Sequence, residues 1–89
     1  MWIKCQPAYG QQHIINSNLI INIWTVCNGP NEFEIRALTI DGNSGSDWKT
    51  IGVYPENQVQ EVINTLFEAM DLDVNTFEMP DVEETPNED

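Results

Sequence analysis

Few side chains in this sequence could do acid–base, nucleophilic or metal chemistry. The 89 residues include one histidine, two cysteines and three Lys or Arg side chains. Catalysis needs such a group held beside a partner that activates it. His13 follows two glutamines and precedes an apolar pair, and no second motif supplies a partner. We therefore predict a surface or strand-edge histidine, no catalytic residue and no enzyme.

The two cysteines, Cys5 and Cys27, lack the Cys-x-x-Cys spacing of redox and zinc motifs. Both lie in stretches rich in strand-forming residues, where a thiol packs as a small apolar side chain. The sequence therefore predicts buried, reduced cysteines rather than a disulfide or a metal site. No metal and no cofactor are expected.

The segment 41–47, Asp-Gly-Asn-Ser-Gly-Ser-Asp, has the glycines and oxygen-bearing side chains of an ion-binding loop. A phosphate-binding loop needs a lysine, which this segment lacks, and its two carboxylates would repel phosphate. A calcium loop needs a bidentate glutamate at its twelfth position, where this chain has Gly52. The segment is predicted to be the tip of a β-hairpin.

Negative charge is concentrated at the C-terminal end of the chain, whose net charge is −12. Residues 1–55 carry four carboxylates and three cations, whereas residues 56–89 carry eleven carboxylates and no Lys or Arg. Three cations among fifteen carboxylates cannot displace counterions from a nucleic acid backbone, so direct nucleic-acid binding is excluded. No stretch approaches the roughly 18 apolar residues of a membrane span or has the pattern of a signal peptide. A cytoplasmic protein is expected.

The clearest secondary-structure element that the sequence predicts is a helix. Its apolar face is formed by residues at offsets 0, 3, 4, 7, 8 and 11, namely Val59, Val62, Ile63, Leu66, Phe67 and Met70. Pro55 and Glu56 suit its start, because a missing N–H costs little there and an anion is favourable. The opposite face is polar and acidic, and it includes Glu61, Glu68 and Asp71.

Three strands are predicted upstream of the helix. Residues 32–37 alternate polar and apolar side chains, residues 48–54 resume an extended pattern after the turn, and residues 20–27 are rich in β-branched and aromatic side chains. They should form an antiparallel meander, with residues 2–6 and 13–16 as short strands or as an extended segment at its edge. The sequence thus predicts an α+β domain at 1–72, with three to five strands and one C-terminal helix. Residues 73–89 are predicted to be an acidic, disordered tail.

The chain also resembles small bacterial and phage proteins without an assigned activity. The resemblance covers roughly residues 2–66, and four segments carry it: Trp2-Ile3-Lys4, Ile14-Ile15-Asn16 with Leu19, Ile51-Gly52-Val53-Tyr54, and Gln60-Glu61-Val62-Ile63. It implies a strand meander that ends in a helix, and it assigns no catalytic residue.

Recognition through a surface is the function that remains, and the first candidate surface is a face of the sheet. If Phe33, Ile35 and Ala37 face the helix, the opposite face receives Leu38 and Ile40. Neighbouring strands would add Trp24, Trp48 and Tyr54 to that face. One helix covers one face of a sheet, so a second apolar face predicts a homodimer or a partner surface. Alternatively, residues 7–18 or the early tail fold over it.

The second candidate surface is acidic. Glu61, Glu68 and Asp71 on the helix, with Phe77 and Met79 in the tail, could bind a basic and apolar groove of a protein partner. A more specific form of this hypothesis is that the carboxylates mimic the phosphates of a nucleic acid and so block a nucleic-acid-binding protein. The alternative is a tail that only maintains solubility. The function predicted from the sequence is a small non-enzymatic interaction or regulatory protein, such as an inhibitor, and the alternative is a structural subunit or homodimer that docks through an apolar sheet face.

Overall fold

The computed structural model describes residues 1–6, 13–41 and 45–82. The elements follow the order β1 (Trp2–Lys4), β2 (Ile14–Asn16), the 3-10 helix η1 (Ser17–Leu19), β3 (Ile20–Gly29), β4 (Glu32–Asp41), β5 (Gly45–Tyr54), α1 (Glu56–Leu72) and β6 (Thr76–Glu78). The predicted α+β class and its helix after the meander are confirmed. The predicted hairpin tip at 42–44 lies outside the described residues.

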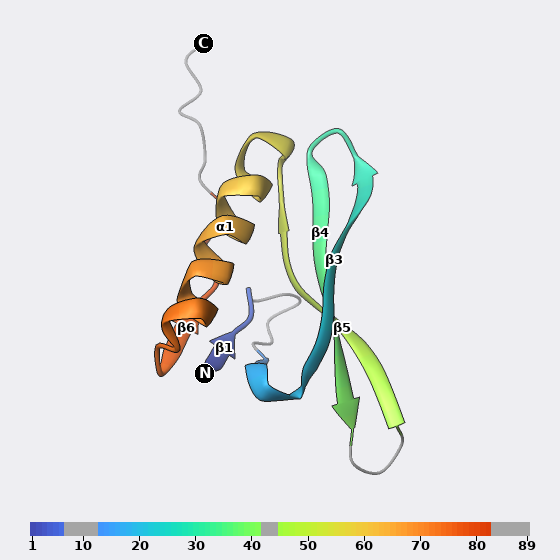
Figure 1. The fold of residues 1–89 in the computed structure, drawn as a ribbon. Helices are drawn as coiled ribbons and strands as arrows, with labels where there is room; N and C mark the ends of the chain where they lie inside the picture. The colour runs from blue at the N-terminus through green and yellow to red at the C-terminus, as the bar shows by residue number, and fades with distance from the viewer. Residues whose placement is uncertain (7–12, 42–44, 83–89) are drawn as a thin grey trace.

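The larger sheet is an antiparallel meander in the order β3-β4-β5. Period-two alternation in β4 puts Ile35 and Ala37 on the face toward the core, where neither is exposed to solvent. Figure 1 shows α1, β1 and β6 on one side of this sheet. The other face, called here the outer sheet face, carries the alternate residues of the three strands.

Helix α1 begins directly after Pro55, which occupies the N-cap position in an extended conformation. Val59, Val62 and Leu66 are buried as the predicted spacing requires, and Ala69 is buried beside them. Phe67, which the sequence placed on the apolar face, is instead 49% exposed. The helix ends at Asp73, which adopts a left-handed conformation with φ of 56° and donates its N–H to the carbonyl oxygens of Ala69 and Met70. This arrangement satisfies carbonyl groups that a helix C-terminus otherwise leaves unpaired.

A second sheet, in the order β2-β1-β6, corrects two predictions. It raises the strand number to six, above the predicted three to five, and it places β6 inside the stretch 73–89 that was predicted to be disordered. Strand β6 pairs in parallel with β1, and backbone bonds extend this pairing from Trp2 N–H to Asn75 and from Met79 N–H to Lys4, each 2.9 Å long. The sequence pattern missed β6 because this strand is only three residues long and is ordered by pairing with β1, which is distant in the sequence. Residues 83–89 of the predicted tail lie outside the described residues.

The core lies between the two sheets and α1. Its most enclosed side chains are Ile3, Ile35, Ile51, Tyr54 and Leu66, contributed by β1, β4, β5 and α1. Among the described residues, no helix combines the length and the apolar character that crossing a membrane requires.

Candidate functional site

The outer sheet face is built by the register of the three strands. Side chains opposite each other in a ladder lie on the same face, so the pairs Trp24–Arg36, Leu38–Trp48 and Glu34–Val53 all lie there. Its apolar and aromatic members are Trp24, Val26, Leu38, Ile40, Trp48 and Val53. Trp48 and Ile40 stay about half exposed, at 48% and 51%. A sheet face of this composition provides an apolar, aromatic contact surface.

Arg36 lies at the centre of this face, between the two tryptophans. Its guanidinium carbon is 4.3 Å from the centroid of the Trp48 ring, which is the geometry of a cation–π contact. Trp24 is directly opposite Arg36 on β3. The contact holds Trp48 in one orientation while half of its surface faces solvent, so this aromatic side chain would lose little conformational entropy on binding.

Glu34 holds Arg36 in place through a hydrogen-bonded ion pair. The Glu34 carboxylate is buried and accepts hydrogen bonds from Arg36 Nη2 at 2.9 Å, from Asn28 Nδ2 at 3.0 Å and from the Thr50 hydroxyl. The bond from Arg36 lowers the pKa of Glu34 to about 2, assisted by Thr50 and Asn28 and opposed by burial. The carboxylate is therefore ionised at neutral pH and holds the guanidinium in place against the Trp48 ring.

The predicted site residues divide between this face and the core. Trp24 and Trp48 come together on the outer sheet face, as predicted. Tyr54 was expected beside them, but it is 1% exposed and lies on the core side. The reason is an irregularity in the β4–β5 ladder, where Ile35 pairs with Gly52 and Arg36 with Thr50, so that Ile51 is an extra residue. Such a bulge moves every later side chain to the opposite face.

Two further predicted site residues are also in the core. Met79 is 2% exposed, and Phe77 is half-buried and packs against the core cluster. The pairing of β6 with β1 turns both side chains inward, so neither is available to a partner in this conformation. The expectation that they form a short exposed motif is corrected. Val82, three residues beyond Met79, is 42% exposed.

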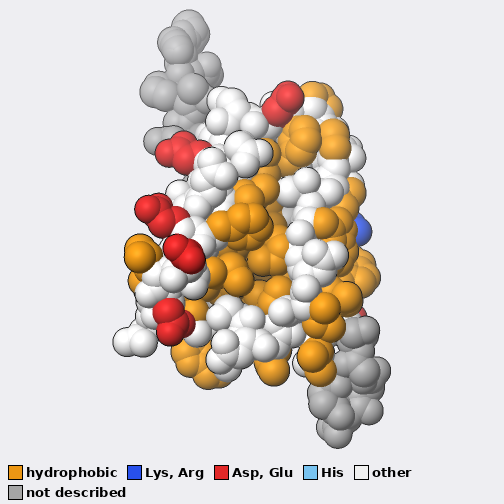
Figure 2. All heavy atoms as spheres, in the orientation of Figure 1, with side chains coloured by type: hydrophobic (Ala, Val, Ile, Leu, Met, Phe, Trp, Pro, Cys, Tyr) orange, Lys and Arg blue, Asp and Glu red, His pale blue; other side chains and the backbone are white. Residues whose placement is uncertain are grey.

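The acidic helix face is exposed as predicted. Glu61, Glu68 and Asp71 lie on the solvent side of α1, and Figure 2 shows carboxylates spaced along this helix. The ion pairs found among the described residues join Arg36 to Glu34 and Lys49 to Asp47, so both lie within the larger sheet. The negative potential of the helix face is therefore not neutralised by an ion pair within the described parts of the chain.

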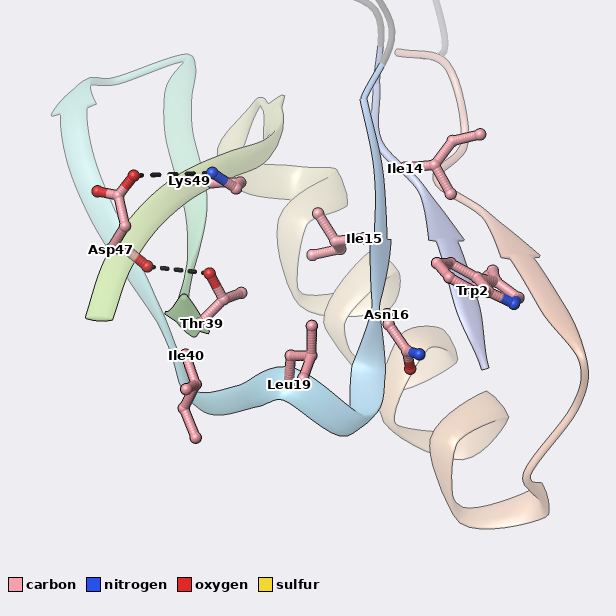
Figure 3. Close-up of a pocket in the computed structure, with 9 residues that line it drawn as sticks. All are labelled: Trp2, Ile14, Ile15, Asn16, Leu19, Thr39, Ile40, Asp47 and Lys49. Atoms are coloured by element: carbon pink, nitrogen blue, oxygen red, sulfur yellow. Dashed lines mark hydrogen bonds and ion pairs between the residues drawn. The ribbon is translucent and has the colours of Figure 1, made fainter. Parts of the chain in front are cut away.

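A pocket of about 380 Å³ opens where the smaller sheet and η1 meet the ends of β4 and β5 (Figure 3). Four of its lining side chains, Trp2, Ile14, Leu19 and Ile40, are each about half exposed. On the β5 side Lys49 Nζ lies 3.7 Å from a carboxylate oxygen of Asp47. The pocket thus adds a second apolar surface, with one ion pair at its rim.

Cys5 and His13 carry the nucleophilic and acid–base groups that the sequence singled out, and the structure describes both. The backbone N–H of Cys5 donates to the carbonyl oxygen of His13 at 2.8 Å, so these residues lie side by side. The Cys5 thiol is nevertheless buried, and burial raises its pKa to about 11, against a smaller opposing effect of Lys49. A thiol with this pKa stays protonated at neutral pH and is a poor nucleophile. Cys27, expected to be buried like Cys5, is an exposed free thiol.

No family model matches the chain, and neither a curated protein nor a solved structure shows significant similarity to it. The resemblance to small bacterial and phage proteins therefore stays a prediction. The sequence pattern missed Glu34 and Arg36 as members of the site. Their spacing of two on a predicted strand was a usable signal, since it placed them on the same face as Leu38.

Proposed function

We propose that this chain is a non-enzymatic protein-interaction domain that binds a protein partner through the outer sheet face. The observation that supports this most directly is Trp48, half exposed and held over Arg36 at 4.3 Å. Tryptophan and arginine are the residues most enriched among those that dominate binding energy at protein interfaces. On this face they occur together, flanked by Trp24, Leu38 and Ile40.

The arrangement favours a partner with an apolar contact surface over a strongly charged one. The charge of Arg36 is matched by that of Glu34, whose carboxylate oxygen lies 2.9 Å from Arg36 Nη2, so the pair presents little net charge. The guanidinium stacks on the indole ring of Trp48, and about half of the Trp48 surface stays exposed for contact. Binding here should therefore depend weakly on salt, because little charge needs to be screened or paired.

The test is capture of the partner with matched variants. The chain, Trp48→Ala and Phe67→Ala serve as baits in a lysate of the source cells, and captured proteins are quantified by mass spectrometry at low and high salt. Phe67 is the control, because it is 49% exposed against 48% for Trp48 but lies on α1. The proposal expects a protein that is retained by Phe67→Ala and at high salt, and reduced at least about tenfold by Trp48→Ala. Equal capture by both variants would refute it.

The acidic face of α1 supports a second candidate function, that of an inhibitor of a basic protein such as a nucleic-acid-binding protein. Its support is the row of exposed carboxylates Glu61, Glu68 and Asp71, which no described cation pairs. The matched test is the triple variant Glu61→Gln, Glu68→Gln and Asp71→Asn. Capture that disappears in this variant and at high salt, but survives Trp48→Ala, would favour the acidic face over the outer sheet face.

A further inference from the structure

Strand β3 is an edge of the larger sheet. It pairs with β4 along one side. Its register is regular from Asn22 to Cys27 and is interrupted by irregularities between Ile20 and Asn22 and between Cys27 and Gly29. Within the described residues, no backbone hydrogen bond reaches the other side of this six-residue stretch. A row of main-chain donors and acceptors is therefore available to another strand.

The main-chain groups on this open side can be identified from the ladder. In an antiparallel pair the N–H and C=O of a residue point to one side of the strand, and those of the next residue point to the other. Val53 donates its N–H to the Gln6 side-chain oxygen at 2.8 Å, hence away from β4. Its partner Glu34 must then direct its own groups toward Val26 on β3. By alternation, the groups that point to the open side belong to Ile23, Thr25 and Cys27.

The open edge of β3 lacks the usual protection against strand pairing. Natural proteins block such edges with lysine, proline, bulges or a covering segment. The stretch Asn22–Cys27 contains no charged residue and no proline, and its bulges lie at its two ends. The other edge of the same sheet is covered, since Gln6 donates its N–H to the carbonyl oxygen of Ile51 at 2.9 Å and accepts from Val53. Within the described parts of the chain, one edge of the sheet is thus covered and the other is open.

We propose that β3 pairs antiparallel with β3 of a second copy of this chain, joining two three-stranded sheets into one of six strands. A second copy fits because the edge is uncharged along its regular length, so a two-fold arrangement brings no like charges opposite each other. The carboxylates of α1 lie across the molecule from this edge, as Figure 2 shows for the helix side. This orientation therefore keeps the carboxylates of the two helices away from the shared edge.

The register follows from the same geometry. A two-fold axis through Thr25 brings Thr25 opposite Thr25 of the second copy, and Ile23 opposite Cys27 of the second copy. In this alignment the main-chain groups of Ile23, Thr25 and Cys27 all form hydrogen bonds with the second copy. The exposed Thr25 side chains would face each other on the core side of the joined sheet, a favourable cross-strand pair.

Sedimentation equilibrium tests the dimer. A six-residue strand pair is a small interface, so association is expected at about 0.1–1 mM chain rather than at nanomolar concentration. The mass should rise toward twice the 10.2 kDa of one chain. Thr25→Lys should weaken association at least tenfold by placing like charges together, and Thr25→Pro should do so by removing a donor that the monomer does not use. Thr65→Lys, the same change on the exposed side of α1, is the control and should dimerise as the unaltered chain does.

Amide hydrogen exchange tests the register. With increasing concentration the N–H groups of Ile23, Thr25 and Cys27 should become protected, whereas those of Trp24 and Val26 should be protected at every concentration. A chain that stays monomeric at about 1 mM, a Thr25→Lys variant that dimerises normally, or concentration-dependent protection of Trp24 and Val26 would each overturn the proposal. The inference is independent of the proposed function, because Trp48→Ala should leave the dimer intact.

Discussion

Replacing Glu34 by glutamine removes the charge that holds the outer sheet face together. The carboxylate accepts hydrogen bonds from Arg36, Asn28 and Thr50. Glutamine keeps the shape of the side chain, but one carboxylate oxygen becomes an NH₂ group, which cannot accept a bond from a donor. If the NH₂ group faces Thr50, the hydroxyl can turn to accept from it; if it faces Arg36 and Asn28, these donors lose their partner. In either case the bond from Arg36 loses the assistance of the negative charge.

The cost can be bounded in two ways. Hydrogen bonds to a charged group each contribute about 1.5–3 kcal/mol, and glutamine retains part of the network. Independently, a carboxyl whose pKa falls from 4.5 to about 2 on folding gains at most about 3 kcal/mol at neutral pH. Solvent screening near the surface reduces this upper limit. We therefore expect Glu34→Gln to lower the free energy of unfolding by about 2 kcal/mol at pH 7.

The pH dependence of this stability difference shows whether it comes from the lost charge or from lost packing. Because the pKa of Glu34 is lower in the folded than in the unfolded protein, its stabilisation is full above pH 4.5 and is lost as the pH falls through about 2. Urea unfolding, followed by tryptophan fluorescence at pH 7, 4 and 2.5, measures the difference between the original chain and Glu34→Gln. That difference should shrink steadily with acidification.

A matched control is available on the same strand. Glu32→Gln removes one charge from an exposed position of β4 and should change the unfolding free energy by less than about 0.5 kcal/mol. The reasoning fails if the Glu34→Gln difference is the same at pH 7 and 2.5, or if Glu32→Gln costs as much.

Three further predictions concern the core and the thiols. Gly52→Ala should cost about 2 kcal/mol in urea unfolding, because a Cβ there would lie 2.6 Å from the Tyr54 ring, whereas Gly29→Ala, with no atom within 4 Å, should be nearly neutral; equal costs would contradict this. Tyr54→Phe should lower the free energy of unfolding by about 1 kcal/mol and speed amide exchange in β6. The reason is that the Tyr54 hydroxyl donates at 2.7 Å to the carbonyl oxygen of Pro80, just after β6, and unchanged exchange would count against that role. Maleimide labelling followed by mass spectrometry should modify Cys27 quickly and Cys5 only after unfolding, and rapid labelling of native Cys5 would contradict its burial.

Local periodicity explains what the sequence could predict. The spacing of Val59, Val62 and Leu66 lies within one helix and depends on no distant contact, so the helix and its buried face were predictable. The alternation around Ile35 and Ala37 likewise identified the core side of β4. Trp24 and Trp48 could be assigned to the outer sheet face because their strands flank β4 in a meander.

Features that depend on pairing could not be predicted from one strand at a time. Counting by twos from Trp48 puts Tyr54 on the outer face, and only the extra residue at Ile51 reverses it. The order of β6 depends on β1 at the other end of the sequence, so its three residues show no pattern of their own. The hydrogen bond between Glu34 and Thr50 likewise depends on the register of two strands.

The three surfaces proposed to bind a partner or a second copy differ in charge, and that difference makes their roles separable. The net charge of −12 is concentrated in residues 56–89, which include the exposed face of α1, whereas the outer sheet face neutralises its own arginine with Glu34 and the regular part of the β3 edge carries no charge. A partner bound at α1 should therefore dissociate as salt rises, while one bound at the outer sheet face should stay. Association through β3 should strengthen with salt, because screening reduces the repulsion between two acidic copies. Salt dependence and variants at Trp48, Glu61 and Thr25 together identify which surface is in use.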